Sequence, residues 1–389
     1  MNKPTQVFPL IAKTMAGMEE ILAEELHQLG VTNIEILTRA VSFEATTKQM
    51  YQANYLCRTA LRILKPIGNF SITSEEDFYL GMLKTPWEKY FGIDNTFAID
   101  ATLSGSVFTH SKYVALRCKD AVADRFRNKF QKRPSVDTVK PDVRIHIRLH
   151  NNHCEIFLDS SGESLHKRGY RKSVSEAPIS EVLAAGMILL SGWDRKTDFM
   201  DFMCGSGTIL IEAAMMASNV PAGYYREDFG FMRWNDYDAD LFEEVMDEAA
   251  QLITEPECNF YGSDISENSI EVSIINARNA KLHKDIQFIR CDFKDQHPVN
   301  DTCFIITNPP YGERIETTDI VQLYKDIGDT LKHNFPGCKA WIISAAFQAL
   351  KFVGLKPSRK IILFNGPLEC RFVRFEMYEG SRKTKEEKE

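Results

Sequence analysis

Beyond Lys172 the sequence alternates short apolar runs with longer segments in which apolar residues recur at helical spacing. The apolar runs predict strands at residues 198–202, 260–264, 286–290, 304–307, 340–344, 361–364 and 371–377. Helices are predicted at residues 179–190, 208–217 and 267–280. This alternation predicts a parallel sheet with helices on both of its faces. Asn365-Gly366 separates the last two strands, so we expect a tight hairpin and an antiparallel last strand.

The first 172 residues follow a different pattern, in which helices and strands do not alternate regularly. Helices are expected at residues 14–29, 48–61, 74–87 and 120–133. Strands are expected at residues 34–37, 41–44 and 97–103, and as a hairpin over 143–158. This order predicts an α+β module and not a continuous doubly wound sheet. The acidic stretch between Asn219 and Cys258 is expected to form a solvated helix that shields one edge of the later sheet.

Composition narrows the class of protein without changing this arrangement. The 389 residues are 44% apolar and 26% charged, which excludes a fibrous or disordered chain and predicts two or three domains. No apolar run approaches the roughly 18 residues of a membrane span, and the N-terminus lacks a signal-peptide core. We therefore expect a cytoplasmic protein. The nine cysteines include no C-x-x-C pair, which argues against a disulfide framework or a zinc site.

The net charge of −7 conceals an asymmetry between the two halves of the chain. Residues 1–172 hold 24 basic and 19 acidic side chains, a balance of +5, whereas residues 173–389 hold 23 and 35, a balance of −12. Phosphate binding depends on local groups of Lys and Arg, and two such groups stand out. The first lies on the expected helix 120–133 and comprises Arg125, Arg127, Lys129, Lys132 and Arg133. The second lies between His166 and Lys172 and comprises Lys167, Arg168, Tyr170 and Arg171.

Each basic group also has a plain structural interpretation. A charged helix face is usually only a solvated surface, and this applies above all to the first group. The second group mixes cations with a tyrosine and a glycine, a composition suited to holding phosphate and stacking a base. A linker would have a similar composition, so both interpretations stay open for this segment.

Four neighbouring side chains carry donor atoms suited to a metal ion, namely His146, His150, His153 and Cys154. In residues 143–150, however, apolar side chains alternate with Arg and His, as they do in a half-buried strand. The histidines are therefore expected on the exposed face of a hairpin, and no metal site is expected.

The segment Asp201 to Thr208, Asp-Phe-Met-Cys-Gly-Ser-Gly-Thr, leads from an expected strand into an expected helix. Gly205 and Gly207 lack a Cβ, so a ligand can approach the backbone closely at these positions. The segment lacks the third glycine of the dinucleotide fingerprint and the lysine of a P-loop. Nicotinamide cofactors and ATP are therefore poor fits.

Two carboxylates follow the next two expected strands. Asp264 ends one strand and could accept hydrogen bonds from two ribose hydroxyls, while Asp292 follows the other and could accept from an adenine amino group. The carboxyl ends of parallel strands border the ligand crevice of such a sheet. Each carboxylate is equally consistent with a helix cap, so neither identifies a ligand by itself.

The segment Thr307 to Arg314, Thr-Asn-Pro-Pro-Tyr-Gly-Glu-Arg, follows the fourth expected strand. Pro309 and Pro310 stiffen the backbone, so the direction of its carbonyls is fixed. The Asn308 side-chain oxygen and the Pro309 carbonyl can both accept hydrogen bonds from one planar exocyclic amine, and Tyr311 offers a ring face to the base. The pattern predicts a clamp for an aromatic amine, with a rigid turn after a strand as the structural alternative.

Together these segments resemble the class I S-adenosylmethionine-dependent methyltransferases, and Asn-Pro-Pro-Tyr resembles the branch that methylates the exocyclic amines of bases. The order of His-Lys-Arg-Gly-Tyr-Arg, the glycine segment and the Asn308 segment, behind an α+β module, is similar to that of the THUMP-domain RNA methyltransferases. The nearest resemblance, over almost the whole chain, is to the bacterial large-subunit ribosomal RNA guanine-N2 methyltransferases. Some members of that family carry a second, fused methyltransferase domain, for which we expect this chain to be too short.

The resemblance implies a Rossmann-like α/β methyltransferase domain, with a seven-stranded sheet and an antiparallel last hairpin, behind ferredoxin-like and THUMP modules. It implies a ferredoxin-like part over residues 1–44 and a THUMP RNA-binding domain over 45–160. It further implies a basic linker over 161–178, the methyltransferase domain over 179–380 and a disordered tail over 381–389.

The resemblance also implies roles for individual residues. S-adenosylmethionine would be bound by Asp201, Cys204, Gly205, Gly207, Thr208, Asp264, Ile265, Asp292, Phe293 and Asn308. The target base would be held by Asn308, Pro309, Pro310 and Tyr311. RNA would be bound by both basic groups, with Lys167, Arg168 and Arg171 bridging to the active site. Neither a metal nor a membrane partner is implied.

The resulting hypothesis is an S-adenosylmethionine-dependent enzyme that methylates the N2 amine of a guanine in large-subunit ribosomal RNA. Adenine-N6 methylation and guanine-N2 methylation of transfer RNA stay open, because the same clamp fits either amine. A non-catalytic RNA-binding or ribosome-assembly protein is the alternative from another functional class.

Overall fold

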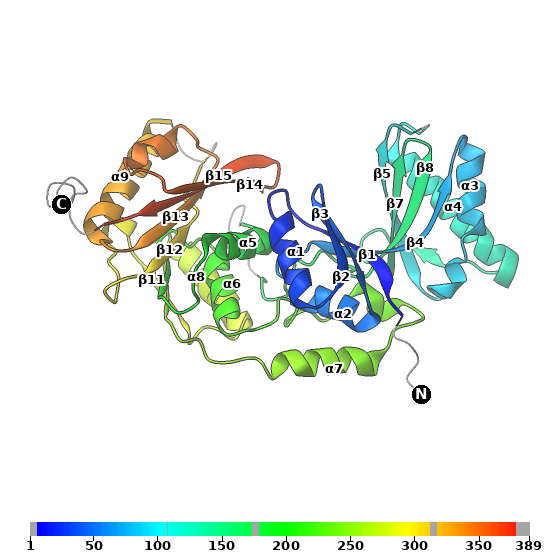
Figure 1. The fold of residues 1–389 in the computed structure, drawn as a ribbon, viewed down its shortest axis with the longest axis horizontal. Coiled ribbons are helices and arrows are strands. Elements are labelled where there is room, and N and C mark those ends of the chain that lie inside the picture. Colours follow the sequence, from blue (N-terminus) through cyan, green and yellow to red (C-terminus); the bar gives the residue numbers. More distant parts are fainter. Residues whose placement is uncertain (1–5, 107, 173–178, 312–316, 379–389) are drawn as a thin grey trace. The chain divides into compact units, whose positions relative to one another are not determined.

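The computed structural model describes residues 6–106, 108–172, 179–311 and 317–378. The chain divides into two compact units, whose elements are labelled in Figure 1. The first unit comprises Met1–Thr14, Leu22–Leu165 and Arg226–Glu248, and the second comprises Met15–Ile21, His166–Tyr225 and Ala249–Glu389. Each unit therefore contains segments that are distant from one another in the sequence.

The first unit is built on an eight-stranded sheet with strand order β2-β3-β1-β4-β8-β7-β5-β6. Its strands are β1 (Phe8–Lys13), β2 (Thr32–Leu37), β3 (Ala40–Ala45), β4 (Arg62–Ser71), β5 (Thr96–Ser104), β6 (Ser135–Val136), β7 (Val143–His150) and β8 (His153–Asp159). Its helices include α1 (Glu19–Gln28), which begins in the second unit, α2 (Thr47–Leu56), α3 (Glu75–Lys84), η1 (Trp87–Lys89) and α4 (Ser111–Phe130). This mixed order confirms the predicted α+β module.

The two faces of this sheet differ because its strands alternate apolar and polar residues. On β7, Ile145 and Ile147 are buried, whereas Arg148 and His150 point to the other face and are exposed. Burial of each such isoleucine contributes about 1.5–3 kcal/mol, so the alternation fixes which face the helices cover. Helices α3 and α4 pack together on the apolar side, and α4 contacts β5.

Residues 226–248 follow the second unit in sequence but pack on the first. The short helix η2 (Gly230–Arg233) places the Phe231 ring 4.4 Å from the ring of Tyr51 in α2. Phe242 of α7 (Ala239–Ala250) lies 5.6 Å from the same tyrosine, and all three side chains are buried. The prediction of a purely solvated helix here is wrong, because the segment contributes an aromatic core as well as an acidic surface.

The second unit contains a seven-stranded sheet with strand order β11-β10-β9-β12-β13-β15-β14. Its strands are β9 (Phe199–Asp201), β10 (Phe260–Asp264), β11 (Ile286–Arg290), β12 (Phe304–Thr307), β13 (Lys339–Ser344), β14 (Arg359–Asn365) and β15 (Leu368–Glu376). Its helices include α5 (Glu181–Ser191), α6 (Thr208–Ala217), α8 (Glu267–Asn279), η3 (Phe293–Asp295), α9 (Thr317–Asn334) and η4 (Ala349–Val353). Strands β9 to β13 are parallel and β15 is antiparallel to both neighbours, as predicted.

The strand order of this sheet determines where a ligand can bind. From β9 the chain moves outward to β10 and β11, and it then returns to place β12 on the other side of β9. In open α/β sheets a crevice forms at such a reversal, beyond the carboxyl ends of the strands. The loops after β9 and β12 therefore emerge side by side at this crevice.

Candidate functional site

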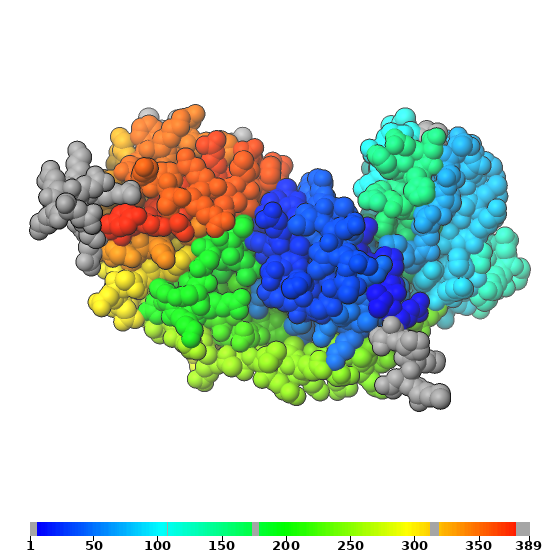
Figure 2. Space-filling view, in the orientation of Figure 1, coloured from blue at the N-terminus to red at the C-terminus, as the bar shows by residue number. Residues whose placement is uncertain are grey.

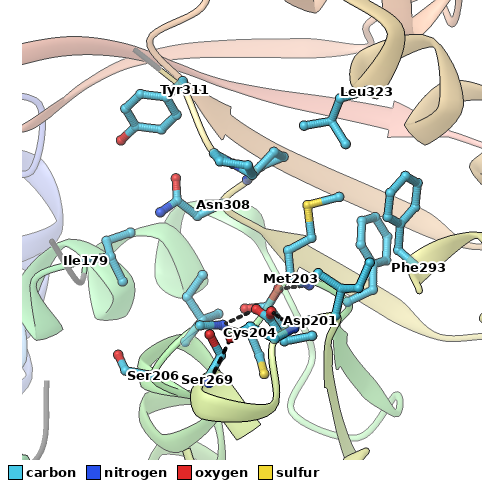
Figure 3. Close-up of a pocket in the computed structure, with 18 of the residues that line it drawn as sticks. Ile179, Asp201, Met203, Cys204, Ser206, Ser269, Phe293, Asn308, Tyr311 and Leu323 are labelled. Carbon is cyan, nitrogen blue, oxygen red and sulfur yellow. Dashed lines mark hydrogen bonds between the residues drawn. The ribbon is translucent and has the colours of Figure 1, made fainter. Parts of the chain in front are cut away.

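A cavity of about 1340 Å³ lies in the second unit at the carboxyl ends of β9, β10 and β12. Ligand pockets for one small molecule usually enclose about 300–1,000 Å³, so this cavity has room for a cofactor together with part of a second molecule. Figure 3 shows Asn308 and Tyr311 on one side of it and Cys204 and Ser206 on the other.

Most of the predicted cofactor and base residues line this one cavity. They are Asp201, Cys204, Gly205, Thr208, Asp264, Ile265, Asp292, Phe293, Asn308, Pro309, Pro310 and Tyr311. Gly207 lies behind the wall, where a Cβ would come within 3.2 Å of the Ser273 side chain. Residues 312–314, which complete the predicted clamp segment, lie outside the described residues.

The glycine loop is held open by a carboxylate of the neighbouring strand. The backbone N–H of Gly205 donates to Asp264 Oδ2 at 3.0 Å, and Ser273 Oγ donates to the Gly205 carbonyl at 2.8 Å. Gly205 has a φ of 54° and nothing lies within 4 Å of where its Cβ would be, so the backbone faces open space there. Asp264 Oδ1 also accepts from the Ser266 N–H at 2.9 Å, so this carboxylate organises the loop besides facing the cavity.

A second buried link joins the two predicted loops. Thr307 Oγ1 donates to Asp201 Oδ1 at 2.8 Å, and the Met203 N–H donates to the same oxygen at 3.2 Å. Burial raises the pKa of Asp201 to about 7, because the charged carboxylate is poorly solvated and Asp264 adds a like charge. The end of β9 is thereby fixed to the last residue of β12, directly before Asn308.

The opposite end of the cavity has an apolar wall. Ile265 is 68% exposed although it is a large aliphatic residue, and Phe293 lies across the same wall. Asp292 begins η3, and its Oδ1 accepts from the Lys294 N–H at 3.0 Å. Asp292 is thus a helix cap that also borders the cavity, so the two interpretations of its sequence position hold together. A flat, partly apolar ligand with polar edges fits this wall.

The predicted amine clamp contains one unsatisfied acceptor. Asn308 Oδ1 is buried and has no hydrogen-bond partner among the described residues. A buried polar atom left without a partner costs about 1–3 kcal/mol, so such atoms in native proteins usually meet a water or a ligand. The Asn308 oxygen therefore marks a position where the cavity is ready to receive a hydrogen-bond donor.

Sequence reasoning missed the residue that holds the clamp's tyrosine. Asn365 Nδ2, at the end of β14, donates to the Tyr311 hydroxyl at 2.9 Å. Asn365, Gly366 and Leu368 also line the cavity. The Asn-Gly pair signalled a hairpin correctly, but nothing in the sequence indicated that the hairpin would border this site. Its proximity depends on β15 inserting between β13 and β14.

The second basic group is largely internal to the fold. Arg168 and Tyr170 are 1% and 0% exposed, and Arg168 Nε and the Tyr170 hydroxyl donate to Glu212 Oε1 of α6 at 3.4 and 3.1 Å. The prediction that these two residues contact RNA is therefore wrong, since RNA cannot reach them. Lys167 is exposed, in agreement with a surface role.

Arg171 of the same segment supports the cavity instead. One of its terminal nitrogens donates to Thr208 Oγ1 at 2.6 Å and to the Ile179 carbonyl at 2.8 Å. Its Nε lies 3.3 Å from Glu181 Oε1, and both side chains are largely buried. Burial raises the pKa of Glu181, and Arg171 opposes this shift. Since Thr208 and Ile179 line the cavity, Arg171 braces the wall that carries the glycine loop.

Much of the first basic group is engaged in ion pairs on the surface of the first unit. Arg125 and Lys129 both contact Glu88 Oε1, at 2.7 and 2.9 Å, and Arg127 pairs with Asp124 at 2.9 Å. The Arg125 guanidinium lowers the pKa of Glu88 to about 2, with a further contribution from Lys129. Lys132 and Arg133 are exposed beyond the end of α4. The role of this group in RNA binding stays a prediction.

Two broad classes of site leave no trace in the described part of the chain. No group of three or more His, Cys, Asp or Glu side chains there is arranged to hold a metal ion. Among the helices of residues 6–378 that the structure describes, none combines the length and apolarity needed to cross a bilayer.

Comparison with known families divides the chain into three matched regions. Residues 9–64 match an RlmL ferredoxin-like domain, residues 73–159 match a THUMP domain, and residues 168–374 match an RMKL-like methyltransferase domain. The last match covers more than half of the chain and contains every residue of the cavity described above.

Individual relatives agree with these matches. The chain is 38% identical over 364 residues to the ribosomal RNA large subunit methyltransferase K/L of Psychromonas ingrahamii, covering 92% of this chain but only 48% of that protein. The chain thus spans about half the length of this curated relative. Among solved structures, SMU.472, a putative methyltransferase complexed with SAH, superposes with a TM-score of 0.86 at 28% identity over 98% of this chain and 100% of the other. A predicted N6-adenine-specific DNA methylase from Listeria monocytogenes gives 0.84 at 26% identity over 97% of both chains.

Proposed function

Because the chain belongs to the family defined by the RMKL-like methyltransferase domain, we propose that it transfers a methyl group to the N2 amine of a guanine in large-subunit ribosomal RNA. The methyl donor is S-adenosylmethionine, and the target lies in folded RNA. The THUMP match and the name of the K/L relative support an RNA substrate.

The observation that carries the proposal is the unpaired Asn308 oxygen in the cavity wall. A donor with two hydrogens, such as an exocyclic amine, can satisfy Asn308 Oδ1 and the Pro309 carbonyl together. Tyr311, whose hydroxyl is held by Asn365, offers its ring to the flat base. Metal-assisted or nucleophilic chemistry finds no comparable support in this cavity.

The rest of the cavity fits the methyl donor. Gly205 presents open backbone, Asp264 borders the loop, and Ile265 and Phe293 form an apolar wall with Asp292 at its edge. The glycine loop would hold the methionine part, Asp264 the ribose, and the apolar wall with Asp292 the adenine. When bound, S-adenosylmethionine supplies an electrophilic methyl carbon on a sulfonium.

The protein contributes alignment more than acid–base chemistry. The lone pair of a guanine amine is delocalised into the ring, so the amine is a weak nucleophile. Acceptors at Asn308 and Pro309 favour the pyramidal form of the nitrogen, in which the lone pair points toward the methyl carbon. Holding both reactants in one closed cavity removes most of the entropic cost of their encounter. The proton can leave the methylated nitrogen after transfer, so no strong base is needed.

Substitution of Asn308 by Ala tests this proposal. We expect methyl transfer to fall by at least about 100-fold, the size of effect seen when one transition-state hydrogen bond is removed. Affinity for S-adenosylhomocysteine, measured by calorimetry, should change little. The control is Asn152→Ala, an exposed turn position in the first unit. Full activity of the Asn308 variant would refute the clamp.

The nature of the product separates the remaining candidates. Digestion of methylated RNA to nucleosides distinguishes N2-methylguanosine from N6-methyladenosine, and the 26% identical adenine-specific methylase homologue is the reason to keep the second target in view. Parallel reactions on ribosomal and transfer RNA identify the substrate. Absence of label transfer from S-adenosylmethionine to any RNA would favour a non-catalytic RNA-binding or assembly protein.

A further inference from the structure

One strand belongs to both halves of the eight-stranded sheet in the first unit. The first residues of β4 pair with β1, with Leu64 opposite Ile11, and the remainder pairs with β8 as far as Ser71 opposite His153. The register of β4 against β8 shifts between Pro66 and Gly68, as at a β-bulge. Bulges bend the strand that contains them, so the two halves of the sheet are inclined toward each other.

The bend creates a hollow on the side of the sheet that the helices do not cover. Figure 2 shows a notch between the lobe that contains β2 and β3 and the lobe that contains β5, β7 and β8. Both lobes belong to the first unit. Lys13 faces this uncovered side because it alternates with the buried Ala12, and Arg148 faces it because it alternates with the buried Ile147.

Three cations from different elements gather here, namely Lys13 of β1, Arg39 of the β2–β3 turn and Arg148 of β7, and we refer to them as the notch cations. The Thr14 N–H donates to the Arg39 carbonyl at 3.0 Å, and Lys13 pairs with Ala40 across the ladder, so the turn lies beside Lys13. All three side chains are exposed.

Electrostatics shows that the notch cations are close to one another. Burial lowers the pKa of Lys13, and the positive charges of Arg148 and Arg39 lower it further. Most other basic residues on this face have acidic partners: Arg62 contacts Asp159 and Arg144 contacts Asp100. Lys13 forms no ion pair or side-chain hydrogen bond with any residue that the structure describes. A cation among like charges is unfavourable in the free protein and becomes favourable when an anion binds between them.

We propose that the notch cations bind the phosphate backbone of the substrate RNA, with Lys13 as the central contact. The inference rests on the proposed function, which makes RNA the polyanion that this enzyme must hold. A phosphodiester chain presents a single negative charge at regular intervals, which matches separate cations on two facing walls. The site differs from the basic group on α4, where Arg125, Arg127 and Lys129 are already paired with acidic side chains.

The test compares Lys13→Gln and Arg148→Gln with Arg127→Gln, a matched arginine on α4 of the same unit. Binding of a protein-free large-subunit ribosomal RNA transcript is measured by filter retention between about 50 and 200 mM salt. For Lys13→Gln we expect a 3- to 10-fold loss of affinity and a decrease of about 0.7–0.9 in the slope of log K against log salt, the signature of one lost phosphate contact. Arg148→Gln should behave similarly, and Arg127→Gln should bind as the native protein does.

Stability separates binding from folding in the same variants. Lys13→Gln removes a like-charge repulsion, so its urea midpoint should equal or exceed that of the native protein while its RNA affinity falls. If native protein binds RNA and Lys13→Gln binds it with the same affinity and salt slope, the notch is not a phosphate site. If native protein does not bind RNA at all, the proposed function itself fails. Binding of Lys13→Gln that is weakened only for anionic vesicles, and not for RNA, would also overturn the inference.

Discussion

Arg171 offers the sharpest contrast between what the sequence suggests and what the structure predicts. In the sequence it belongs to a basic group suited to RNA, whereas in the structure it contacts Thr208, the Ile179 carbonyl and Glu181. Two of these three partners line the cavity. A change at Arg171 should therefore weaken cofactor binding and leave RNA binding unchanged.

The size of the effect follows from burial. The Arg171 and Glu181 side chains are 13% and 3% exposed, so removing the arginine leaves a buried carboxylate without its cation. Breaking a buried ion pair typically costs about 3–5 kcal/mol, whereas neutralising both partners is often close to neutral. Arg171→Gln should thus destabilise the fold by about 3 kcal/mol or more, and Arg171→Gln with Glu181→Gln should recover most of that loss. Arg171→Lys keeps the charge but loses the forked geometry and should lie between them.

The assay measures three quantities on each variant. Urea unfolding gives stability, calorimetry with S-adenosylhomocysteine gives cofactor affinity, and filter retention gives RNA affinity. In the stable double variant we expect cofactor affinity to remain about 10-fold reduced, which corresponds to about 1.4 kcal/mol, because Thr208 and Ile179 are still unanchored. The exposed neighbour Lys172→Gln is the control. Normal cofactor affinity together with weakened RNA binding in the double variant would refute the bracing role.

Three further predictions follow from buried contacts. Asp201, with a pKa of about 7 against an ordinary 3.8, takes up a proton in the fold that it lacks when unfolded between these values, so stability should fall as pH rises from about 4 to 7; Asp201→Asn should flatten that profile and gain up to a few kcal/mol at pH 8 in urea titrations. Tyr311→Phe and Asn365→Ala remove the same hydrogen bond, so each should lower kcat about fivefold and the double variant should be no slower than either. Gly169→Ala should destabilise the protein by more than 2 kcal/mol in thermal unfolding, because Gly169 has a φ of 101° and a Cβ would lie 2.0 Å from the Tyr225 carbonyl oxygen.

Each of these predictions has a result that contradicts it. An unchanged pH profile in Asp201→Asn would mean that this carboxyl does not titrate across the stated range. Additive losses in the Tyr311 and Asn365 variants would mean that the two residues act independently. Gly205→Ala provides the comparison for Gly169, since its φ of 54° is also positive but its Cβ position is empty. Equal stability losses at the two glycines would show that steric contact with Tyr225 is unimportant.

Local pattern was sufficient to predict the elements of the second unit and their chemistry. Parallel strands require apolar runs and their crossover helices require amphipathic ones, so β9, β10 and β12 and the polar residues that follow them could be located from residue order alone. Because carboxyl ends of parallel strands share one edge, the glycine loop and Asn308 were also expected to meet, and both line one cavity. Helix α9 was not predicted, although Ile320, Tyr324, Ile327 and Leu331 are spaced on one helical face and are buried.

Residue order alone determined the alternation of strands and helices, the two ligand loops and the two basic groups, because each depends on neighbours within a few positions. Only the tertiary structure decided which charged side chains are available to a ligand. Arg168 and Arg171 look like their exposed neighbour Lys167 in the sequence, yet they meet Glu212 and Glu181 in the core. Conversely, Lys13 has no basic neighbour in sequence and gains Arg39 and Arg148 only when the shared strand β4 bends. Burial and long-range pairing decide whether a charge is neutralised within the fold, and no local pattern contains that information.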